Sequence, residues 1–226
     1  WHGLGTQDAT WFRSQLEALA KDSLQAATHC IGDSAVRWVL NAYQDILGGT
    51  NDRRWRIEHA QVVAPEDFDG FGRNSVIPSV QPTHATSDMY WAGERLGRNR
   101  IRRAYAYQEL LRQLGMVALG TDFPVEDTDP RKTFFASVSR QDASGYPEGG
   151  FQSSNALSKE QTLRGMTQWV ALAQFQETDL GTIEIGKWAD LTWMDRNWLT
   201  IAPADVLETR VLGTCIAGEW LYLAER

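Results

Sequence analysis

The sequence predicts an α/β protein with a parallel sheet, followed by a small all-β region. Through most of the 226-residue chain, short strand-like runs alternate with segments in which apolar residues recur at helical spacing. Beyond residue 177, β-rich runs follow one another with turn residues between them and no helical pattern. Strands and helices that alternate in this way indicate βαβ units, in either a doubly wound sheet or a barrel.

The chain opens with a helix, a strand and a second helix. Apolar residues recur at intervals of three and four over residues 9–20 and again over residues 36–47, as on one face of a helix. Residues 23–30, between the two, have the pattern of a short extended run. The segment GGTND then ends the second helix.

The same alternation continues as far as residue 122. Pro65 opens the short helical pattern of residues 65–71, as proline does at the first position of many helices. The elements expected here are strands over 55–60, 75–82 and 116–122, a short helix over 65–71 and a longer helix over 100–114.

One further helix and three β-rich runs complete the pattern. Ser158 and Gln161 have the spacing of a capping box, and apolar residues follow on one face, so a single helix is expected over 157–175. The β-rich runs cover residues 187–195, 209–218 and 219–224.

Composition indicates a folded, soluble chain. Hydrophobic residues make up 42% and charged residues 23%, which are ordinary values for a globular protein. The net charge of -7 and the absence of a basic stripe predict no nucleic-acid partner. No window reaches the ~18 to 20 apolar residues of a membrane span, so no membrane partner is expected. Two isolated cysteines suit a reducing compartment, and we expect a cytoplasmic location.

Four side chains that can bind metal stand where the four expected strands end: His29, His59, His84 and Asp122. In a parallel βα fold, catalytic residues come from the carboxyl ends of several strands, so these side chains can meet. Two imidazoles and a carboxylate suit Zn²⁺ or a similar ion that activates water. The alternative is core histidines with a helix-capping aspartate, and for His84 alone the two readings are balanced.

Strand alternation sorts the neighbours of these residues, because successive side chains point to opposite faces. If His59 points into the site, Ile57 is expected to do so too, whereas Arg56 and Glu58 share the opposite face and could pair. Glu58 is then structural. By the same rule Cys30 points away from His29, which disfavours a Cys/His nucleophilic pair.

Six motifs, in this order, resemble those of metal-dependent amidohydrolases, and the nearest group is the amidohydrolase 3, or YtcJ-like, branch related to N-substituted formamide deformylase. The motifs are HCIGDSAV, RIEHAQ, QPTHATSDMYW, LGTDFPVE…DP, ALSKEQTLRGMT and LGTIEIGKWADLTWMDRN. The resemblance implies a (β/α)₈ barrel with a small β-sandwich, and one or two divalent metal ions.

The resemblance also implies a role for each of the four candidate site residues. It implies that His29 and His59 are metal ligands of the fifth and sixth strands. Asp122 matches the eighth-strand aspartate, which binds metal and shuttles a proton as the catalytic residue. His84, on the seventh strand, is implied to contact substrate. The turn Gly186–Asp190 matches a structural signature at the entry to the sandwich.

The sequence also departs from the family pattern. It contains no H-x-H pair, which the family's first strand contributes, and a complete barrel needs ~250 residues. We therefore expect residues 1–177 to form the second half of the barrel, strands 5 to 8, and residues 178–226 to form the C-terminal strands of the sandwich. The missing N-terminal half, or a second copy in a homo-oligomer, would complete the structure.

These observations lead to one functional prediction and one alternative. The prediction is a metal-dependent hydrolase, with Zn²⁺ as the expected ion, that acts on an amide-type C–N bond of a small-molecule substrate through metal-activated water. We expect this chain alone to be inactive. The alternative is a non-catalytic remnant or binding module whose ten tryptophans form an aromatic surface, although core packing is the simpler account for most of them.

Overall fold

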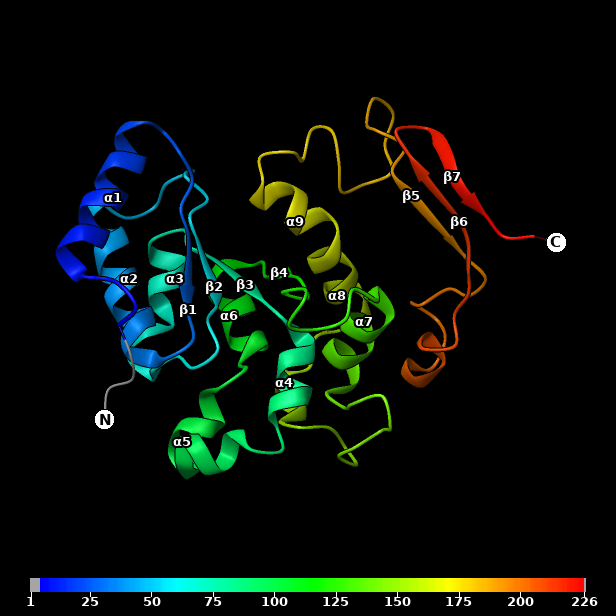
Figure 1. The fold of residues 1–226 in the computed structure, drawn as a ribbon, viewed down its shortest axis with the longest axis horizontal. Helices are drawn as coiled ribbons and strands as arrows, with labels where there is room; N and C mark the ends of the chain where they lie inside the picture. The colour runs from blue at the N-terminus through cyan, green and yellow to red at the C-terminus, as the bar shows by residue number, and fades with distance from the viewer. Residues whose placement is uncertain (1–4, 226) are drawn as a thin grey trace. The chain divides into compact units, whose positions relative to one another are not determined.

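The computed structural model describes residues 5–225, which fall into two compact units (Figure 1). The first unit contains the described residues up to Gln81 together with Asp88–Ala118. The second unit contains Pro82–Ser87 and the described residues from Leu119 onward.

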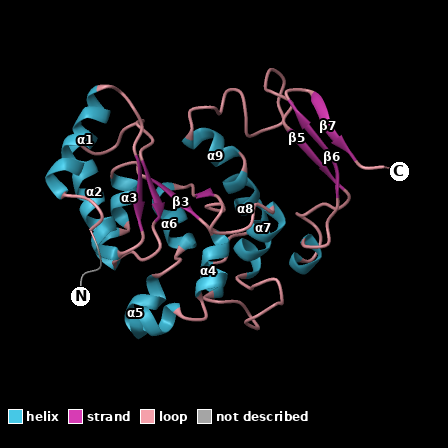
Figure 2. Ribbon diagram, viewed as in Figure 1, coloured by secondary structure: helices cyan, strands magenta, loops and turns pink. Residues whose placement is uncertain are grey.

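The expected parallel sheet is present. Its strands lie in the order β1 (Ala27–Cys30), β2 (Arg56–His59), β3 (Ile77–Val80) and β4 (Ala118–Leu119). Strand β2 pairs in parallel with both β1 and β3, as successive βαβ units require (Figure 2). The strand expected over 116–122 is shorter than predicted, because regular pairing covers only two of its residues.

In the first unit a helix precedes the first strand, and further helices follow the strands. They are α1 (Ala9–Lys21), α2 (Asp33–Leu47), the 3₁₀ turn η1 (Pro65–Asp67), α3 (Asp69–Arg73), α5 (Ala92–Arg100), the 3₁₀ turn η2 (Ile101–Arg103) and α6 (Tyr107–Leu114). The continuous helix expected over 100–114 is wrong. Tyr105 has a left-handed backbone with φ of 55°, which ends helical geometry, so α6 begins only at Tyr107.

Helix α2 is joined to the sheet through Tyr43, which is fully buried. Its hydroxyl lies 2.6 Å from the hydroxyl of Thr28 on β1 and donates to the carbonyl of Arg56 on β2 at 3.1 Å. Its ring packs edge-on against Trp55 at 4.8 Å, and the Trp55 indole donates to the carbonyl of Leu24. Both aromatic residues thus bury apolar area while their polar atoms are hydrogen-bonded.

The second unit combines helices with a three-stranded antiparallel sheet. Its elements are α4 (Pro82–Asp88, of which the last residue belongs to the first unit), α7 (Pro130–Ser139), η3 (Ser153–Asn155), α8 (Lys159–Met166), α9 (Gln168–Ala173), β5 (Leu191–Met194), η4 (Pro203–Val206), β6 (Val211–Ile216) and β7 (Glu219–Leu223). The sheet order β5-β6-β7 confirms the β-rich tail. Within residues 5–225, no helix has both the length and the apolar character needed to cross a membrane.

The capping box of Ser158 and Gln161 is confirmed, with both hydrogen bonds present. The single helix expected over 157–175 is wrong, because it breaks at Thr167, whose φ and ψ are -131° and -81°. The Thr167 hydroxyl donates back to the carbonyl of Leu163 at 2.7 Å, a bond that bends helices. Two short helices result.

Helix α7 was missed in the sequence although its start signal is present. The Asp129 carboxylate accepts a hydrogen bond from the Arg131 amide, and Pro130 is the first helical residue. On its buried side Phe134 packs on Trp198 at 4.8 Å, and the Trp198 indole donates to the Thr209 hydroxyl. This core joins α7 to the β-rich tail.

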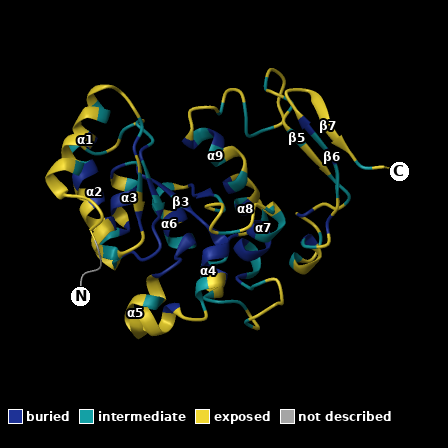
Figure 3. Ribbon diagram, in the orientation of Figure 1, coloured by how far each residue is buried: buried dark blue, intermediate teal, exposed yellow. Residues whose placement is uncertain are grey.

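The tryptophans are less buried than expected, and β7, which carries Trp220, is exposed along its whole length (Figure 3). Of those in the described residues, only Trp55 and Trp198 are buried, and Trp169 is half-buried. The exposed ones are Trp11, Trp38, Trp91, Trp188, Trp193 and Trp220. Core packing therefore does not account for most of them, which corrects the expectation from sequence.

Gly48 ends α2 in a left-handed conformation with φ of 74°, and its amide donates to the carbonyl of Gln44. A Cβ at this position would meet no atom within 4 Å, so an alanine there is strained only by its backbone. We expect Gly48→Ala to lower the free energy of unfolding by about 1 kcal/mol. Urea unfolding followed by circular dichroism measures the change.

Gly93→Ala is the matched control for Gly48→Ala. Gly93 lies in the first turn of α5, has an ordinary φ, and has equally open space around its Cβ position. Alanine favours helix there, so the free energy of unfolding should stay level or rise by up to about 1 kcal/mol. Equal unfolding midpoints for the two variants would contradict the backbone explanation.

Burial raises the pKa of the Cys30 thiol to about 12. At pH 8 almost none of it is thiolate, the form that reacts with disulfide reagents. We expect the native Cys215→Ser variant, which keeps only Cys30, to react with Ellman's reagent only after unfolding. Rapid modification of the native variant at pH 8 would instead support a nucleophilic Cys30.

Candidate metal centre

His29 and His59 come together at the carboxyl end of the parallel sheet. His29 is the third residue of β1 and His59 is the last residue of β2. Their ring centroids are 4.4 Å apart with an interplanar angle of 71°. His29 is exposed, whereas the side chain of His59 is only 7% exposed. Both residues belong to the first unit.

The pairing of β1 with β2 shows which side chains share a face. Thr28 pairs with Ile57, and His29 pairs with Glu58, and paired residues point to the same side of a sheet. Thr28 contacts Tyr43 of α2, so Ile57 is on the helix-covered face. His29 and Glu58 are therefore on the opposite face.

The alternation predicted for β2 is wrong at its last residue. Ile57 is buried on the helix-covered face, yet the ring of His59 contacts His29 on the other face. His59 and Ala60 have φ of 73° and 43°, in the left-handed region. This backbone turns the His59 side chain away from the direction that strand alternation gives it, at a cost of about 1–2 kcal/mol per residue.

Hydrogen bonds of the two residues that follow this strained turn hold it in place. The Tyr105 amide donates to the carbonyl of Gln61, and the Val62 amide donates to the carbonyl of Ile31. The buried Gln61 amide group also donates to the Asp88 carboxylate at 2.7 Å and to the Tyr105 hydroxyl at 2.6 Å. The Tyr105 hydroxyl in turn donates to Asp88, so this buried polar cluster is internally bonded.

Gln81, directly after β3, contacts His59 and was missed in the sequence. Its side-chain oxygen lies 2.9 Å from Nδ1 of His59, and both side chains are buried. An amide oxygen only accepts, so this contact is a hydrogen bond when Nδ1 carries the proton, and a neutral ring then has its lone pair on Nε2. The signal in the sequence is the position of Gln81 at the end of a strand-like run, the position that also holds His29 and His59.

Arg56 and Glu58 form the expected ion pair, at 3.0 Å. Arg56 also donates to the side-chain oxygen of Gln25 at 2.9 Å. The predicted face is wrong, however, because the register places Glu58 beside His29 and not behind the strand. Glu58 is thus a carboxylate on the same side of the sheet as the two histidines.

His84 and Asp122 belong to the second unit. His84 is not at a strand end as predicted: β3 stops at Val80, and His84 is a buried residue of α4. Asp122 lies beyond the short β4, is exposed, and has a left-handed φ of 56°. Ser87 of α4 donates to the Glu126 carboxylate at 2.6 Å, which links this helix to the loop after Asp122.

The donor set fits a divalent metal ion. Two adjacent imidazoles, one of them with its Nδ1 against an amide oxygen, present the ligand type that Zn²⁺ and related ions prefer. Cys30 adds no donor, since its side chain lies on the helix-covered face with Thr28.

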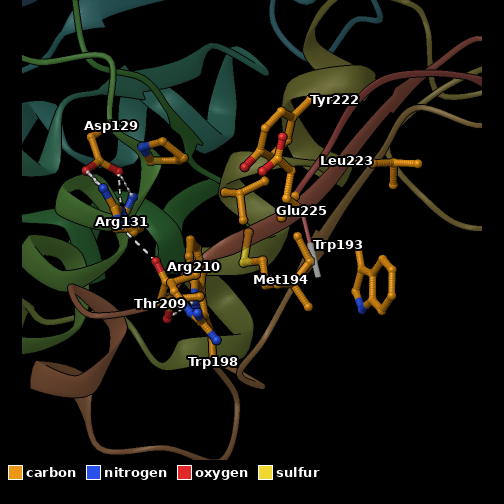
Figure 4. A pocket seen from close by; sticks show the side chains of 14 residues that line it. Asp129, Arg131, Trp193, Met194, Trp198, Thr209, Arg210, Tyr222, Leu223 and Glu225 are labelled. Carbon is orange, nitrogen blue, oxygen red and sulfur yellow. Dashed lines mark hydrogen bonds and ion pairs between the residues drawn. The ribbon is translucent and has the colours of Figure 1, made fainter.

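An open pocket of about 1110 Å³ lies in the second unit, away from these histidines in the sequence (Figure 4). Its polar lining includes Arg131, which is bonded to the Asp129 carboxylate and the Thr209 carbonyl. Its apolar lining includes Trp193 and Leu223. None of the four predicted site residues lines it, so we do not place the chemistry there.

The turn Gly186–Asp190 has the structural role that the resemblance implies. The Lys187 ammonium donates to the carbonyl of Glu177 and to the Thr182 hydroxyl, each at 2.6 Å. The Asp190 carboxylate accepts from the Ala217 amide at 2.7 Å and so joins the turn to the end of β6.

Comparison with known proteins gives consistent matches. Protein LONG AFTER FAR-RED 3 of Arabidopsis thaliana is 33% identical over 224 residues, which are 98% of this chain and 38% of that protein. N-substituted formamide deformylase of Arthrobacter pascens is 25% identical over 208 residues, 90% of this chain and 37% of that protein. An uncharacterized metal-dependent hydrolase of Pyrococcus horikoshii OT3 superposes with a TM-score of 0.77 at 27% identity, covering 88% of this chain and 39% of that structure.

The chain therefore spans less than two fifths of the length of each of these relatives. The family model described as the amidohydrolase family matches residues 3–222, nearly the whole sequence. This match confirms the resemblance drawn from the six motifs. The chain belongs to the amidohydrolase family.

Proposed function

We propose that this chain supplies metal-binding and catalytic residues of a metal-dependent hydrolase that acts on amide-type C–N bonds of a small molecule. The observation that carries the proposal is the pair of imidazoles 4.4 Å apart at the ends of two parallel strands. Family membership supports it, as do the names of two relatives, a metal-dependent hydrolase and a deformylase of N-substituted formamides.

Each predicted residue has a role in this proposal. His29, His59 and Asp122 would hold the ion, and His84 would contact the substrate. A divalent ion bound there would polarise the substrate carbonyl and lower the pKa of water. Asp122 would take the proton of the attacking water and pass it to the leaving nitrogen. His84 offers the same imidazole donor as His29 and His59, so the role of His84 is included in the test below.

We propose Zn²⁺ as the ion, one or two per complete site, because neutral imidazole and carboxylate are among its usual ligands. Fe²⁺, Mn²⁺ and Ni²⁺ accept the same donors, so the measurement covers all four metals. The cytoplasmic location expected from the sequence stays a prediction.

We further propose that other βα units complete the barrel and the site. The relatives are more than twice as long as this chain, which supports this. In the complete protein, residues 1–177 would be half of the barrel and residues 178–226 part of a β-sandwich. The added half would come from the same polypeptide or from a second copy, and the chain alone would be inactive.

A binding module remains the second candidate function. Trp193 on β5 and Trp220 and Tyr222 on β7 are each about half exposed, an unusual concentration of aromatic residues on one small sheet. Aromatic residues are enriched at interfaces. Metal content separates the two functions, because an aromatic binding surface requires no ion.

We expect the purified chain, after zinc loading and desalting, to retain about one ion per molecule, since its proposed ligands include two adjacent imidazoles. Inductively coupled plasma mass spectrometry measures Zn, Fe, Mn and Ni together. His59→Ala and His29→Ala should each lower the retained metal at least about tenfold, which is the loss expected when a ligand is removed. His84→Ala should lower it only if His84 is also a ligand.

His2→Ala is the control, because His2 is the one histidine without a proposed role and lies outside the described residues. Its metal content should equal that of the unaltered chain. Loss of metal in His2→Ala equal to that in His59→Ala, or no retained metal in any preparation, would contradict the metal centre and favour the binding module.

A further inference from the structure

Gln81 is buried at the carboxyl end of β3, and its side chain contacts one of the proposed ligands. Its amide oxygen is 2.9 Å from Nδ1 of His59, and the Gln81 side chain is 6% exposed. Both residues belong to the first unit. The contact therefore joins the ends of two neighbouring strands of one sheet.

Gln81 is itself held from the other side. Its backbone carbonyl accepts a hydrogen bond at 2.9 Å from the hydroxyl of Tyr107, the first residue of α6. The Tyr107 side chain is 1% exposed. A helix of the same unit thus anchors the backbone from which the Gln81 amide reaches His59.

The chemistry of this contact selects one form of the imidazole. A neutral imidazole has one N–H and one lone pair, on different nitrogens. The Gln81 oxygen can only accept, so the bond stabilises the form with the proton on Nδ1 and the lone pair on Nε2. A histidine that binds a metal through Nε2 needs this tautomer.

We propose that Gln81 is a positioning residue that keeps His59 in the Nδ1-protonated tautomer and fixes its ring orientation for metal binding. The metal-binding part rests on the proposed function, whereas the tautomer can be measured without any metal. Because an amide is neutral, Gln81 does this without adding charge beside the ion, unlike the carboxylates that often bond to metal-binding histidines.

The alternative is that Gln81 only satisfies a buried polar group and that His59 is an incidental neighbour. The left-handed backbone of His59 and Ala60 argues against this, because it brings the ring to the side of the sheet where His29 lies. The tautomer ratio of His59 discriminates between the two readings.

The experiment records long-range proton–nitrogen correlations of the histidine rings in the ¹⁵N-labelled, metal-free 226-residue chain, at a pH where imidazole is neutral. His59→Ala identifies the His59 signals. We expect Nδ1–H to predominate in the unaltered chain. In Gln81→Leu, which removes the acceptor, the tautomer ratio should shift toward Nε2–H by roughly 2- to 13-fold, the equivalent of one hydrogen bond.

Two further variants make the result specific. Gln81→Glu keeps an acceptor oxygen at the same position and should retain the Nδ1–H tautomer. Asn74→Leu alters another buried side-chain amide of the same unit, which donates to the carbonyl of Leu40 and not to the turn at His59. Asn74→Leu should leave the tautomer ratio unchanged. An equal shift in Asn74→Leu and Gln81→Leu would overturn the proposal, since general loosening would explain both.

A zinc titration of the same variants separates this inference from the proposed function. Gln81→Leu should bind Zn²⁺ about 10- to 100-fold more weakly than the unaltered chain, the range found for outer ligand partners, and Gln81→Glu should recover most of the affinity. If the unaltered chain binds no zinc, the proposed function fails, while the tautomer result still decides the role of Gln81. If zinc binds and the tautomer ratio is the same in Gln81→Leu, the role of Gln81 is refuted and the metal centre stands.

Discussion

The backbone at His59 and Ala60 is the constraint on which the arrangement of this site depends. Strand β2 would otherwise direct the His59 ring to the side covered by α2, where Ile57 is buried. Left-handed φ angles at two successive non-glycine residues reverse that direction, at a cost of about 1–2 kcal/mol each. Strain of this kind persists only where surrounding contacts determine it, and here the hydrogen bonds of Gln61 and Val62 do so.

The polar clusters around this turn act on different parts of it. The cluster of Gln61, Asp88 and Tyr105 fixes the main chain after the turn, since both the side chain and the carbonyl of Gln61 are bonded. Gln81 instead contacts the imidazole itself. Buried polar groups cost free energy unless they are satisfied, and once satisfied they favour a single geometry. A histidine that is to bind a metal ion needs both its main chain and its ring held in place.

The sequence was sufficient for the parts of the fold that follow from periodicity and local chemistry. The parallel sheet, the antiparallel tail and the capping box of Ser158 are confirmed, because each depends on a pattern within a few residues. The direction of His59 could not be predicted, since strand alternation assumes negative φ throughout. The break at Thr167 and the late start of α6 also depend on backbone angles that no residue type in those segments requires.

The exposed face of β1 and β2 limits what can cover it. His29, Arg56 and Glu58 are on this face, and the last two already satisfy one another at 3.0 Å. The interior of a barrel is usually filled by layers of branched apolar side chains. An apolar layer placed over this face would bury the Arg56–Glu58 ion pair. The attraction between two buried charges barely offsets the free-energy cost of removing them from water. Any strands that complete the sheet must therefore bring polar partners or leave water here, which is also what a hydrolytic site requires.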